Sequence, residues 1–274
     1  MRERESGFDI RKYHKLPKNI DILTYSFPCQ DLSQQGRQKG IKSGTRSGLL
    51  FEIERILNEN KGNLPKILLL ENVKALASKK FILEFNSWIK KLEEFGYTSS
   101  WKIINSTEYG SVQNRERVFM VSVLERKKFD FPIGSKNNKN VKDIWLKNDK
   151  HSFLKLNDNN YINKFTISKN NIIKSFINNW SNFNSENYIY SLEGKGPTLT
   201  ASGANSRLKF LINNEIQIMN SCEAYLYMGF SKNDFNVVKE TNLLTDSKII
   251  FTAGNSISIE VLEKIFEKII KDYF

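Results

Sequence analysis

Lys66-Ile67-Leu68-Leu69-Leu70-Glu71-Asn72-Val73 is the most informative stretch of this sequence. Its apolar run shows no polar alternation, which is typical of a strand buried on both faces of a sheet. A second strand is predicted at residues 21–27, where Pro28 stops it. Between the two strands, apolar residues recur at helical spacing at Leu49, Leu50, Ile53, Ile56 and Leu57. This order predicts a β-α-β unit.

The same alternation continues downstream. The helical period predicts a second helix that ends near Gly96 and carries apolar residues at Ile82, Phe85, Trp88, Ile89 and Leu92. Two further strands are predicted at residues 101–104 and 117–124. Together these elements predict an α/β domain with a mainly parallel sheet.

The composition changes after about Leu124. Residues 126–195 are rich in Asn and Lys and contain scattered aromatic residues. We predict a smaller, irregular domain here and not a linker, because the aromatic side chains need a core. The chain ends in a predicted helix with Ser258 as its N-cap and an apolar stripe at Ile259, Leu262, Ile265, Phe266 and Ile269.

Charge and cysteine content limit the classes of protein. The 274 residues carry 42 Lys and Arg against 30 Asp and Glu, a net charge of +12 that favours a polyanionic partner, with nucleic acid first. An AT-rich genome also enriches Lys, Asn and Ile, so charge alone does not decide. Two Cys and two His argue against a disulfide scaffold and a zinc site. Without a spanning apolar run or a signal peptide, we expect a cytoplasmic protein.

Two chemically active side chains follow the first two predicted strands. Cys29 immediately follows the first strand and Glu71 immediately follows the second. A right-handed crossover places the carboxyl ends of parallel strands at one edge of the sheet, where ligands of α/β proteins bind. A thiol and a carboxylate are therefore expected near each other. The alternative is that Cys29 is a small buried residue and Glu71 an acid at a helix N-terminus.

Three further segments combine polar groups with constrained backbone. In residues 113–117, Arg115 and Arg117 are expected to point the same way if the segment is extended. Residues 196–203 are predicted to form a constrained turn that enters a polar loop. Residues 254–257 are predicted to form a tight turn whose amides and Asn255 bind a small ligand. Taken singly, each segment is also compatible with an ordinary turn or surface charge.

In this order the segments resemble the C5-cytosine DNA methyltransferases. Pro-Cys-Gln at 28–30, Glu-Asn-Val at 71–73, the Gln-x-Arg-x-Arg segment, Gly-x-Pro-Thr-Leu-Thr and the C-terminal Gly-Asn-Ser-Ile turn all match. Residues 25–33 and 200–207 are most similar to the mollicute CpG-specific members. The resemblance covers the chain from about Phe8 onward. It implies an α/β fold: an incomplete Rossmann-like S-adenosylmethionine methyltransferase domain at 1–125, an irregular target-recognition domain at 126–248, and a turn and helix at 249–274 that return to the first domain.

The resemblance also implies a mechanism. A thiolate matching Cys29 adds to C6 of cytosine, Glu71 binds N3, Arg117 holds O2 and Arg115 supports this group. S-adenosylmethionine is the implied methyl donor, and residues matching Pro28, Asn255 and Ser256 contact it. The implied partner is double-stranded DNA with a flipped cytosine, CpG being the expected site. The residues expected to bind DNA are Gln30, Ser33, Ser202, Ala204, Asn205, Ser206 and Arg207.

One departure from the family pattern is large. The Phe-x-Gly-x-Gly cofactor loop and the first three strands of the family have no counterpart before Cys29. Those strands are expected in the middle of the sheet, so their loss would expose strand edges. We therefore expect weak or no S-adenosylmethionine binding by this chain alone. Three explanations are a truncated or frameshifted gene, which we rank first, a split enzyme whose partner chain supplies the segment, and a misassigned start codon.

Two other functions compete with DNA methylation. The first is a non-catalytic, DNA-binding chain that depends on a partner for the cofactor. The second is RNA methylation, against which the substantial region between Leu124 and Gly194 argues, since the RNA-acting relatives have little there. His14, His151 and Cys222 are assigned structural or surface positions, and no metal site is expected.

Overall fold

A computed structural model describes residues 9–27, 47–125 and 127–274. The predicted residues Pro28, Cys29, Gln30 and Ser33 lie outside these ranges. The chain divides into two compact units, one formed by Met1–Ile104 and Glu116–Phe131, the other by Asn105–Arg115 and Pro132–Phe274. This division places 105–115 and 249–274 with the second unit. The functional domain limits given above stay a prediction.

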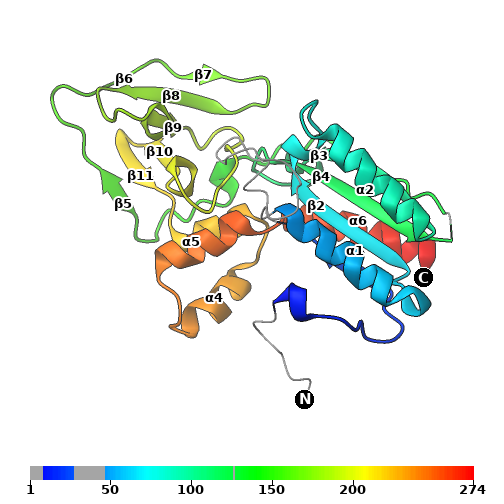
Figure 1. The fold of residues 1–274 in the computed structure, drawn as a ribbon. Coiled ribbons are helices and arrows are strands. Elements are labelled where there is room, and N and C mark those ends of the chain that lie inside the picture. Colours follow the sequence, from blue (N-terminus) through cyan, green and yellow to red (C-terminus); the bar gives the residue numbers. More distant parts are fainter. Residues whose placement is uncertain (1–8, 28–46, 126) are drawn as a thin grey trace. The chain divides into compact units, whose positions relative to one another are not determined.

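The first unit is built on a four-stranded sheet in the order β1-β2-β4-β3 (Figure 1). Its strands are β1 (Ile22–Tyr25), β2 (Ile67–Val73), β3 (Tyr97–Asn105) and β4 (Glu116–Leu124). β2 has a neighbour on each side, and its residues from Ile67 to Leu70 are at most 3% exposed, which confirms the strand predicted from the apolar run.

The expectation of a mainly parallel sheet is wrong for these four strands. β1 and β2 are parallel, with Ile22 opposite Ile67, but β2 and β4 are antiparallel. The chain passes from β3 to β4 through residues 106–115, which hold no crossover helix, so β4 returns in the opposite direction. The four strands are also contiguous, so no strand is missing between them, and within the described residues β1 forms an edge of the sheet.

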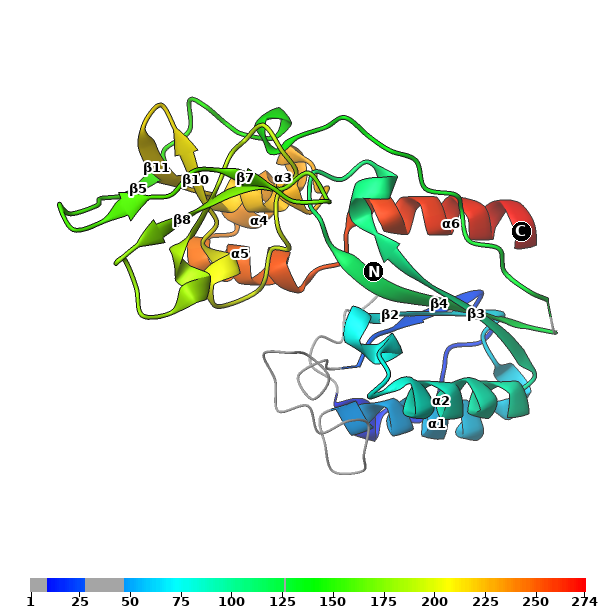
Figure 2. The same ribbon diagram turned by 90° about the horizontal axis from the view of Figure 1, so that it is seen from above.

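Two amphipathic helices lie side by side on one face of this sheet, α1 (Leu50–Glu59) and α2 (Ile82–Glu94) (Figure 2). Both match the predicted helical periods. Their buried side chains, among them Leu57, Phe85 and Leu92, pack with Leu68 and Leu70 of β2 into one core. The described residues of this unit also form short 3-10 helices: η1 (Ile10–Lys12), η3 (Ser47–Leu49), η4 (Lys61–Asn63) and η5 (Lys74–Ala77).

The second unit contains a seven-stranded sheet where the sequence predicted irregular structure. The order is β5-β11-β10-β9-β8-β6, and β7 also pairs with β8. The strands are β5 (Ser152–Leu154), β6 (Tyr161–Ile162), β7 (Thr166–Ile167), β8 (Ile173–Asn178), β9 (Tyr188–Tyr190), β10 (Lys209–Ile212) and β11 (Glu215–Ile218). They are too short for a strong period. Asn213 and Asn214, both with positive φ, form the turn between β10 and β11, as Asn-rich hairpin turns do.

Helices form the rest of the second unit: α3 (Ser221–Tyr227), α4 (Lys232–Glu240), α5 (Asp246–Asn255), α6 (Ile259–Tyr273), η6 (Ser106–Tyr109), η7 (Val141–Asp143), η8 (Asn184–Asn187) and η9 (Ala204–Ser206). Ser258 precedes α6 as predicted, but its hydroxyl donates to Glu260 Oε2 (2.7 Å) and does not cap a backbone amide. Gly254 and Asn255 belong to the last turn of α5, so the predicted tight turn begins inside a helix.

Candidate active site

Glu71 and Arg117 form an ion pair at the carboxyl end of β2. The antiparallel register places Glu71 opposite Phe119 and Val73 opposite Arg117, so the two side chains come from adjacent strands. Arg117 Nε lies 3.3 Å from Glu71 Oε1, and the two side chains are 17% and 12% exposed. Arg117 also donates from Nη1 to the carbonyl of Glu116 (2.8 Å). The fold thus brings a carboxylate and a guanidinium of the predicted site together in a partly dehydrated environment, where their interaction is stronger than in water.

Asn72 ties this strand end to the segment that leads to Pro28. Its side chain is buried, and Nδ2 donates to the carbonyl of Phe27 (3.1 Å), while Oδ1 accepts from the amide of Val73 (2.9 Å). The backbone just before the Pro-Cys-Gln segment is therefore fixed beside Glu71. Asn72 was not among the predicted site residues, although an amide side chain close after a buried apolar run is a usable signal, since a buried amide needs hydrogen-bond partners.

Arg115 serves a different part of the chain from Arg117. Its side chain is buried in the second unit, where Nη1 donates to the carbonyl of Leu199 (2.8 Å) and Nη2 to those of Gly254 (3.2 Å) and Ser256 (2.9 Å). Arg115 and Arg117 were expected to point the same way; Arg115, which precedes β4, binds backbone carbonyls, whereas Arg117 lies in β4 and pairs with Glu71. Three backbone acceptors fit a positioning role better than contact with a reacting base.

Gln113 completes the attachment of the Leu199 peptide. Its Oε1 accepts from the amide of Leu199 (2.8 Å), and Nε2 donates to the carbonyl of Tyr227 (3.2 Å). With Arg115 bound to the Leu199 carbonyl, both backbone groups of this residue are held by side chains of one short segment. Asn114 adds a hydrogen bond from its amide to the carbonyl of Gly196 (2.8 Å). Only the arginines of this segment were singled out from sequence.

Residues 200–207, which we call the recognition loop, are closed by their own hydrogen bonds. Asn205 Nδ2 donates to the carbonyl of Thr198 (3.1 Å), and Ser206 Oγ donates to that of Gly203 (2.8 Å). Gly203 has a φ of 79°, a conformation that glycine adopts without strain. Ser202 and Arg207 are exposed, and Ala204 is half-buried. The side chains of Ser202 and Arg207 are thus the most accessible of the five predicted DNA contacts in this loop.

The chain is similar to proteins of one family over nearly all its length. Residues 2–271 match the family described as C-5 cytosine-specific DNA methylase. The chain belongs to this family. The orphan methyltransferase M.SssI of Spiroplasma monobiae is 50% identical, and the match covers 98% of this chain and 71% of that relative. The type II methyltransferase M.HhaI of Haemophilus parahaemolyticus is 29% identical, with 96% of this chain and 80% of the relative covered.

Solved structures agree with this DNA methylase fold. The S. pombe Dnmt2 methyltransferase has a TM-score of 0.68 at 15% identity, covering 97% of this chain and 84% of that one. The Entamoeba histolytica methyltransferase EhMeth has a TM-score of 0.65 at 18% identity, covering 93% and 78%. At such identities the likeness shows the fold alone. It confirms the predicted Rossmann-like methyltransferase architecture.

Methylases of this family use S-adenosylmethionine, and two described residues are candidates to contact it. Asn255 is exposed at the end of α5, so its amide is available to a polar ligand. Ser256 Oγ already donates to the carbonyl of Ala253 (2.7 Å), although its oxygen can still accept. These groups fit a polar part of the cofactor, and Pro28, the third candidate, lies outside the described residues.

Gly254 brings this end of α5 against the recognition loop. A Cβ added at Gly254 would lie 2.3 Å from the carbonyl carbon of Thr200 and 2.4 Å from the amide nitrogen of Ala201. Only a glycine permits such an approach of two backbones. The backbone of Gly254, which precedes Asn255, therefore lies directly against the loop, and Arg115 bonds to residues on both sides: Leu199 before the loop, and Gly254 and Ser256 on either side of Asn255.

The remaining ionisable candidates have structural surroundings. His151 stacks on Trp145 with ring centroids 4.7 Å apart, and its Nε2 lies 2.9 Å from the buried Glu223 carboxylate. His14 pairs with Glu59 at the surface of the first unit, and Cys222 is buried, which raises its thiol pKa. Within the described ranges, no cluster of three or more His, Cys, Asp or Glu could hold a metal, and no helix has the length and apolarity to cross a membrane.

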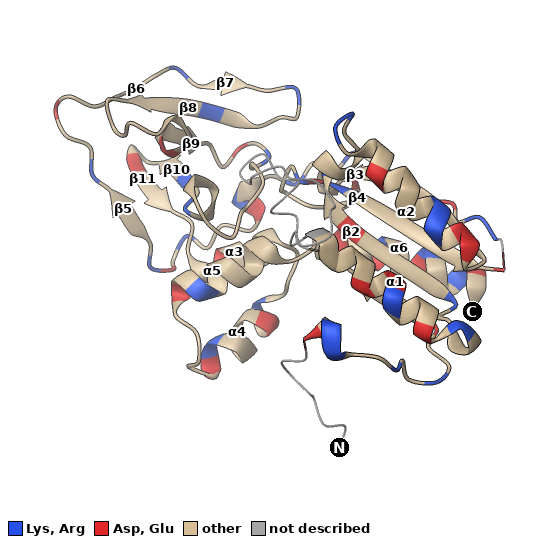
Figure 3. Ribbon diagram, in the orientation of Figure 1, with Lys and Arg blue, Asp and Glu red and all other residues tan. Residues whose placement is uncertain are grey.

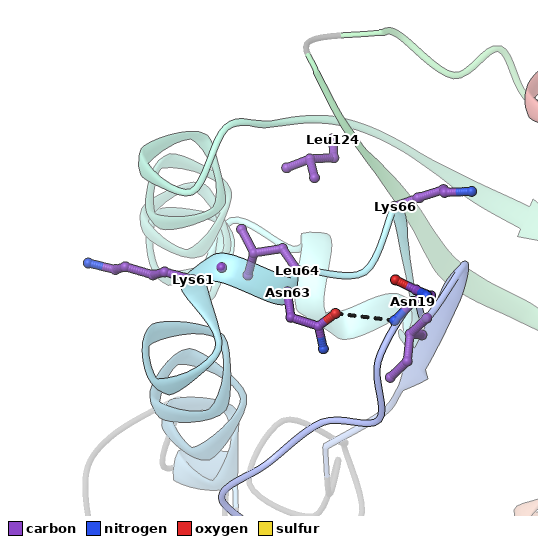
Figure 4. A pocket seen from close by; sticks show the side chains of 8 residues that line it. Asn19, Lys61, Asn63, Leu64, Lys66 and Leu124 are labelled. Carbon is purple, nitrogen blue, oxygen red and sulfur yellow. Dashed lines mark hydrogen bonds between the residues drawn. The ribbon is translucent and has the colours of Figure 1, made fainter.

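A cavity of about 420 Å³ lies in the first unit, away from Glu71. It is lined by Asn19, Ile20, Lys61, Gly62, Asn63, Leu64, Lys66 and Leu124 (Figure 4). These residues surround the amino ends of β1 and β2, whereas Glu71 lies towards the carboxyl end of β2. None of the predicted site residues lines this cavity. Two of its lining residues are joined by a hydrogen bond from the Asn19 backbone amide to Asn63 Oδ1 (3.2 Å).

Proposed function

We propose that this chain methylates C5 of cytosine in duplex DNA through a covalent adduct with Cys29, and that CpG is its target. The observation that carries the proposal is the ion pair between Glu71 and Arg117 at the carboxyl end of β2. The neighbouring Asn72 bonds to Phe27, the residue that directly precedes the Pro-Cys-Gln segment. Family membership and the relative M.SssI support the same chemistry.

The chain's own groups supply the activation of the base. The Cys29 thiolate forms a bond to C6, and the electron pair of the C5–C6 double bond makes C5 nucleophilic. A protonated Glu71 carboxyl donates a hydrogen bond, or its proton, to N3 and so neutralises the negative charge that develops on the ring, while the Arg117 guanidinium beside it binds O2. S-adenosylmethionine, when bound, would supply the methyl group to C5, its S–CH3 bond breaking so that S-adenosylhomocysteine leaves. A base then removes the C5 proton, the C5–C6 double bond re-forms and the Cys29 thiolate leaves.

The target cytosine must leave the duplex, because C5 and C6 are not accessible to Cys29 within the base stack. Gln30, Ser33 and the recognition loop are proposed to contact the DNA, with Ser202, Ala204, Asn205, Ser206 and Arg207 near the base edges. The choice of CpG as the target sequence is based on the similarity of residues 200–207 to the mollicute enzymes. Arg115 contributes by holding the Leu199 peptide and the end of α5.

Methyl transfer is tested with labelled cofactor and with bisulfite sequencing of a plasmid, which maps the modified cytosines. The wild-type chain is expected to modify CpG, Cys29→Ser to modify nothing, and Cys222→Ser, the matched control, to retain activity because Cys222 is buried in α3. A duplex with 5-fluorocytosine should trap the adduct, since fluorine cannot leave as a proton does. Methylation by Cys29→Ser would refute the covalent mechanism.

A second candidate is a DNA-binding chain that needs a separate chain to bind the cofactor. The observation that favours it is the position of β1, whose outer edge has no strand beside it among the described residues. Such an edge accepts another strand. This alternative predicts DNA binding without methyl transfer, and activity when a chain bearing a Phe-x-Gly-x-Gly segment is added. Transfer by the purified chain alone would refute it.

A further inference from the structure

Glu186 bridges two basic residues next to the recognition loop. One carboxylate oxygen lies 2.5 Å from Arg207 Nη2, and the other lies 3.5 Å from Lys209 Nζ. The Glu186 side chain is 22% exposed, that of Lys209 is 6% exposed and that of Arg207 is 57% exposed. The carboxylate therefore joins an internal ammonium to a guanidinium that faces solvent.

Lys209 keeps the Glu186 carboxylate in place. Burial lowers the pKa of Lys209, and the negative charge of Glu186 opposes that effect. A rotation of Glu186 towards solvent would leave the ammonium buried without this counter-charge, which is costly. The backbone around this pair is also held in place, because η8, which contains Glu186, lies against η9, and Lys209 is the first residue of β10.

Arg207 is the exposed cation of the recognition loop. Asn205 and Ser206 already donate hydrogen bonds to Thr198 and Gly203, which limits what they can offer to a ligand. Over the rest of the second unit, Lys and Arg interleave with acidic residues and do not form one basic block (Figure 3). DNA recognition by this loop is therefore expected to depend strongly on the orientation of the Arg207 guanidinium.

We propose that Glu186 is a positioning residue that directs Arg207 towards base edges and keeps it from the DNA backbone. This inference rests on the proposed function. An arginine held at one N–H still offers the others in a fixed plane, the geometry that matches the O6 and N7 atoms of guanine. A released arginine binds phosphates, which carry no sequence information. Glu186 is therefore expected to lower the affinity for DNA of any sequence and to raise the discrimination between sequences.

The experiment compares Glu186→Gln with Glu193→Gln as a matched control. Glu193 forms an exposed pair with Lys142, so both variants lose one negative charge from an ion pair of the same unit. Affinity is measured by fluorescence anisotropy on duplexes with and without the sequence that the wild type methylates, at several salt concentrations. The affinity for the duplex that contains the methylated sequence, divided by the affinity for the duplex that lacks it, is expected to fall about 10-fold in Glu186→Gln. On the duplex that lacks the sequence, the slope of log affinity against log salt concentration should become steeper by about 0.9, the value for one added phosphate contact.

The control should change both affinities by the same factor, and Glu186→Gln should have no effect on an Arg207→Ala background. Because Glu186→Gln leaves Lys209 without this partner, the double variant Glu186→Gln with Lys209→Met removes both charges of the pair, and the same loss of discrimination is expected. Glu186→Gln variants that behave like the control overturn the inference while the proposed function stands. A wild-type chain that neither methylates nor discriminates refutes the proposed function itself.

Discussion

Replacing Gly254 by Ala tests the backbone contact between α5 and the recognition loop. The new Cβ would lie 2.3 to 2.5 Å from three atoms of Thr200 and Ala201, all of them backbone. No side-chain rotation relieves such a contact, so one backbone must move by about 1 Å to reach ordinary van der Waals distance. Leu199, which directly precedes the recognition loop and is bonded to Arg115 and Gln113, resists this displacement.

Two opposing effects determine how much Gly254→Ala changes the free energy of unfolding. Alanine favours a helix over glycine by up to about 1 kcal/mol, while overpacking costs about 1–3 kcal/mol, with the upper end expected when backbone is displaced. We expect a net loss of about 2 kcal/mol in the free energy of unfolding. For a domain of this size that corresponds to a fall in Tm of roughly 4–8 °C.

Gly62→Ala provides the control, because a Cβ at Gly62 meets nothing within 4 Å. Its effect should be neutral or stabilising by less than about 1 kcal/mol. Differential scanning calorimetry measures both variants, and urea titration gives the free energies. If Gly254→Ala melts within 1 °C, roughly 0.3–0.5 kcal/mol, of Gly62→Ala, the close approach is not present in solution and the reasoning fails.

Three further outcomes are expected. Asn72→Ala should lower the methylation rate more than DNA affinity, because it frees the Phe27 carbonyl next to the Pro-Cys-Gln segment; equal losses in both would contradict this. Burial raises the pKa of Tyr190 to about 12, so the native state keeps a proton that the unfolded chain loses above about pH 10. Stability should fall as pH rises from about 10 to about 12, less so in Tyr190→Phe than in Tyr161→Phe, an exposed control; identical pH profiles would exclude Tyr190. Asn255→Ala should weaken S-adenosylmethionine binding in calorimetry; an affinity equal to that of the wild type would exclude Asn255 from the cofactor site.

Several elements could be predicted from sequence because their signals are local. The run Ile67–Leu70 is apolar without alternation, and the strand it forms has neighbours on both sides. The helical periods of α1, α2 and α6 each appear within 15 residues or fewer. The place of Glu71 at the end of β2 followed from the strand alone, since a side chain after a buried run lies at its carboxyl end.

Other features depended on contacts between distant residues. Arg115 and Arg117 are two positions apart, yet one binds the carbonyls of Leu199, Gly254 and Ser256 and the other binds Glu71. No local pattern separates them. The short strands of the second unit, such as β10 and β11, gain their stability from pairing, so their two- to six-residue lengths gave no usable period.

The sequence by itself determined the order of strands and helices in the first unit and the family, and it predicted which side chains are chemically active, because periodicity and motif order are properties of neighbouring residues. The tertiary structure alone decided which partners those side chains meet: Asn72 with Phe27, Gln113 with Leu199 and Glu186 with Arg207. Each pair is more than 20 positions apart or joins two separate elements, and only the packed chain brings its members within hydrogen-bond distance.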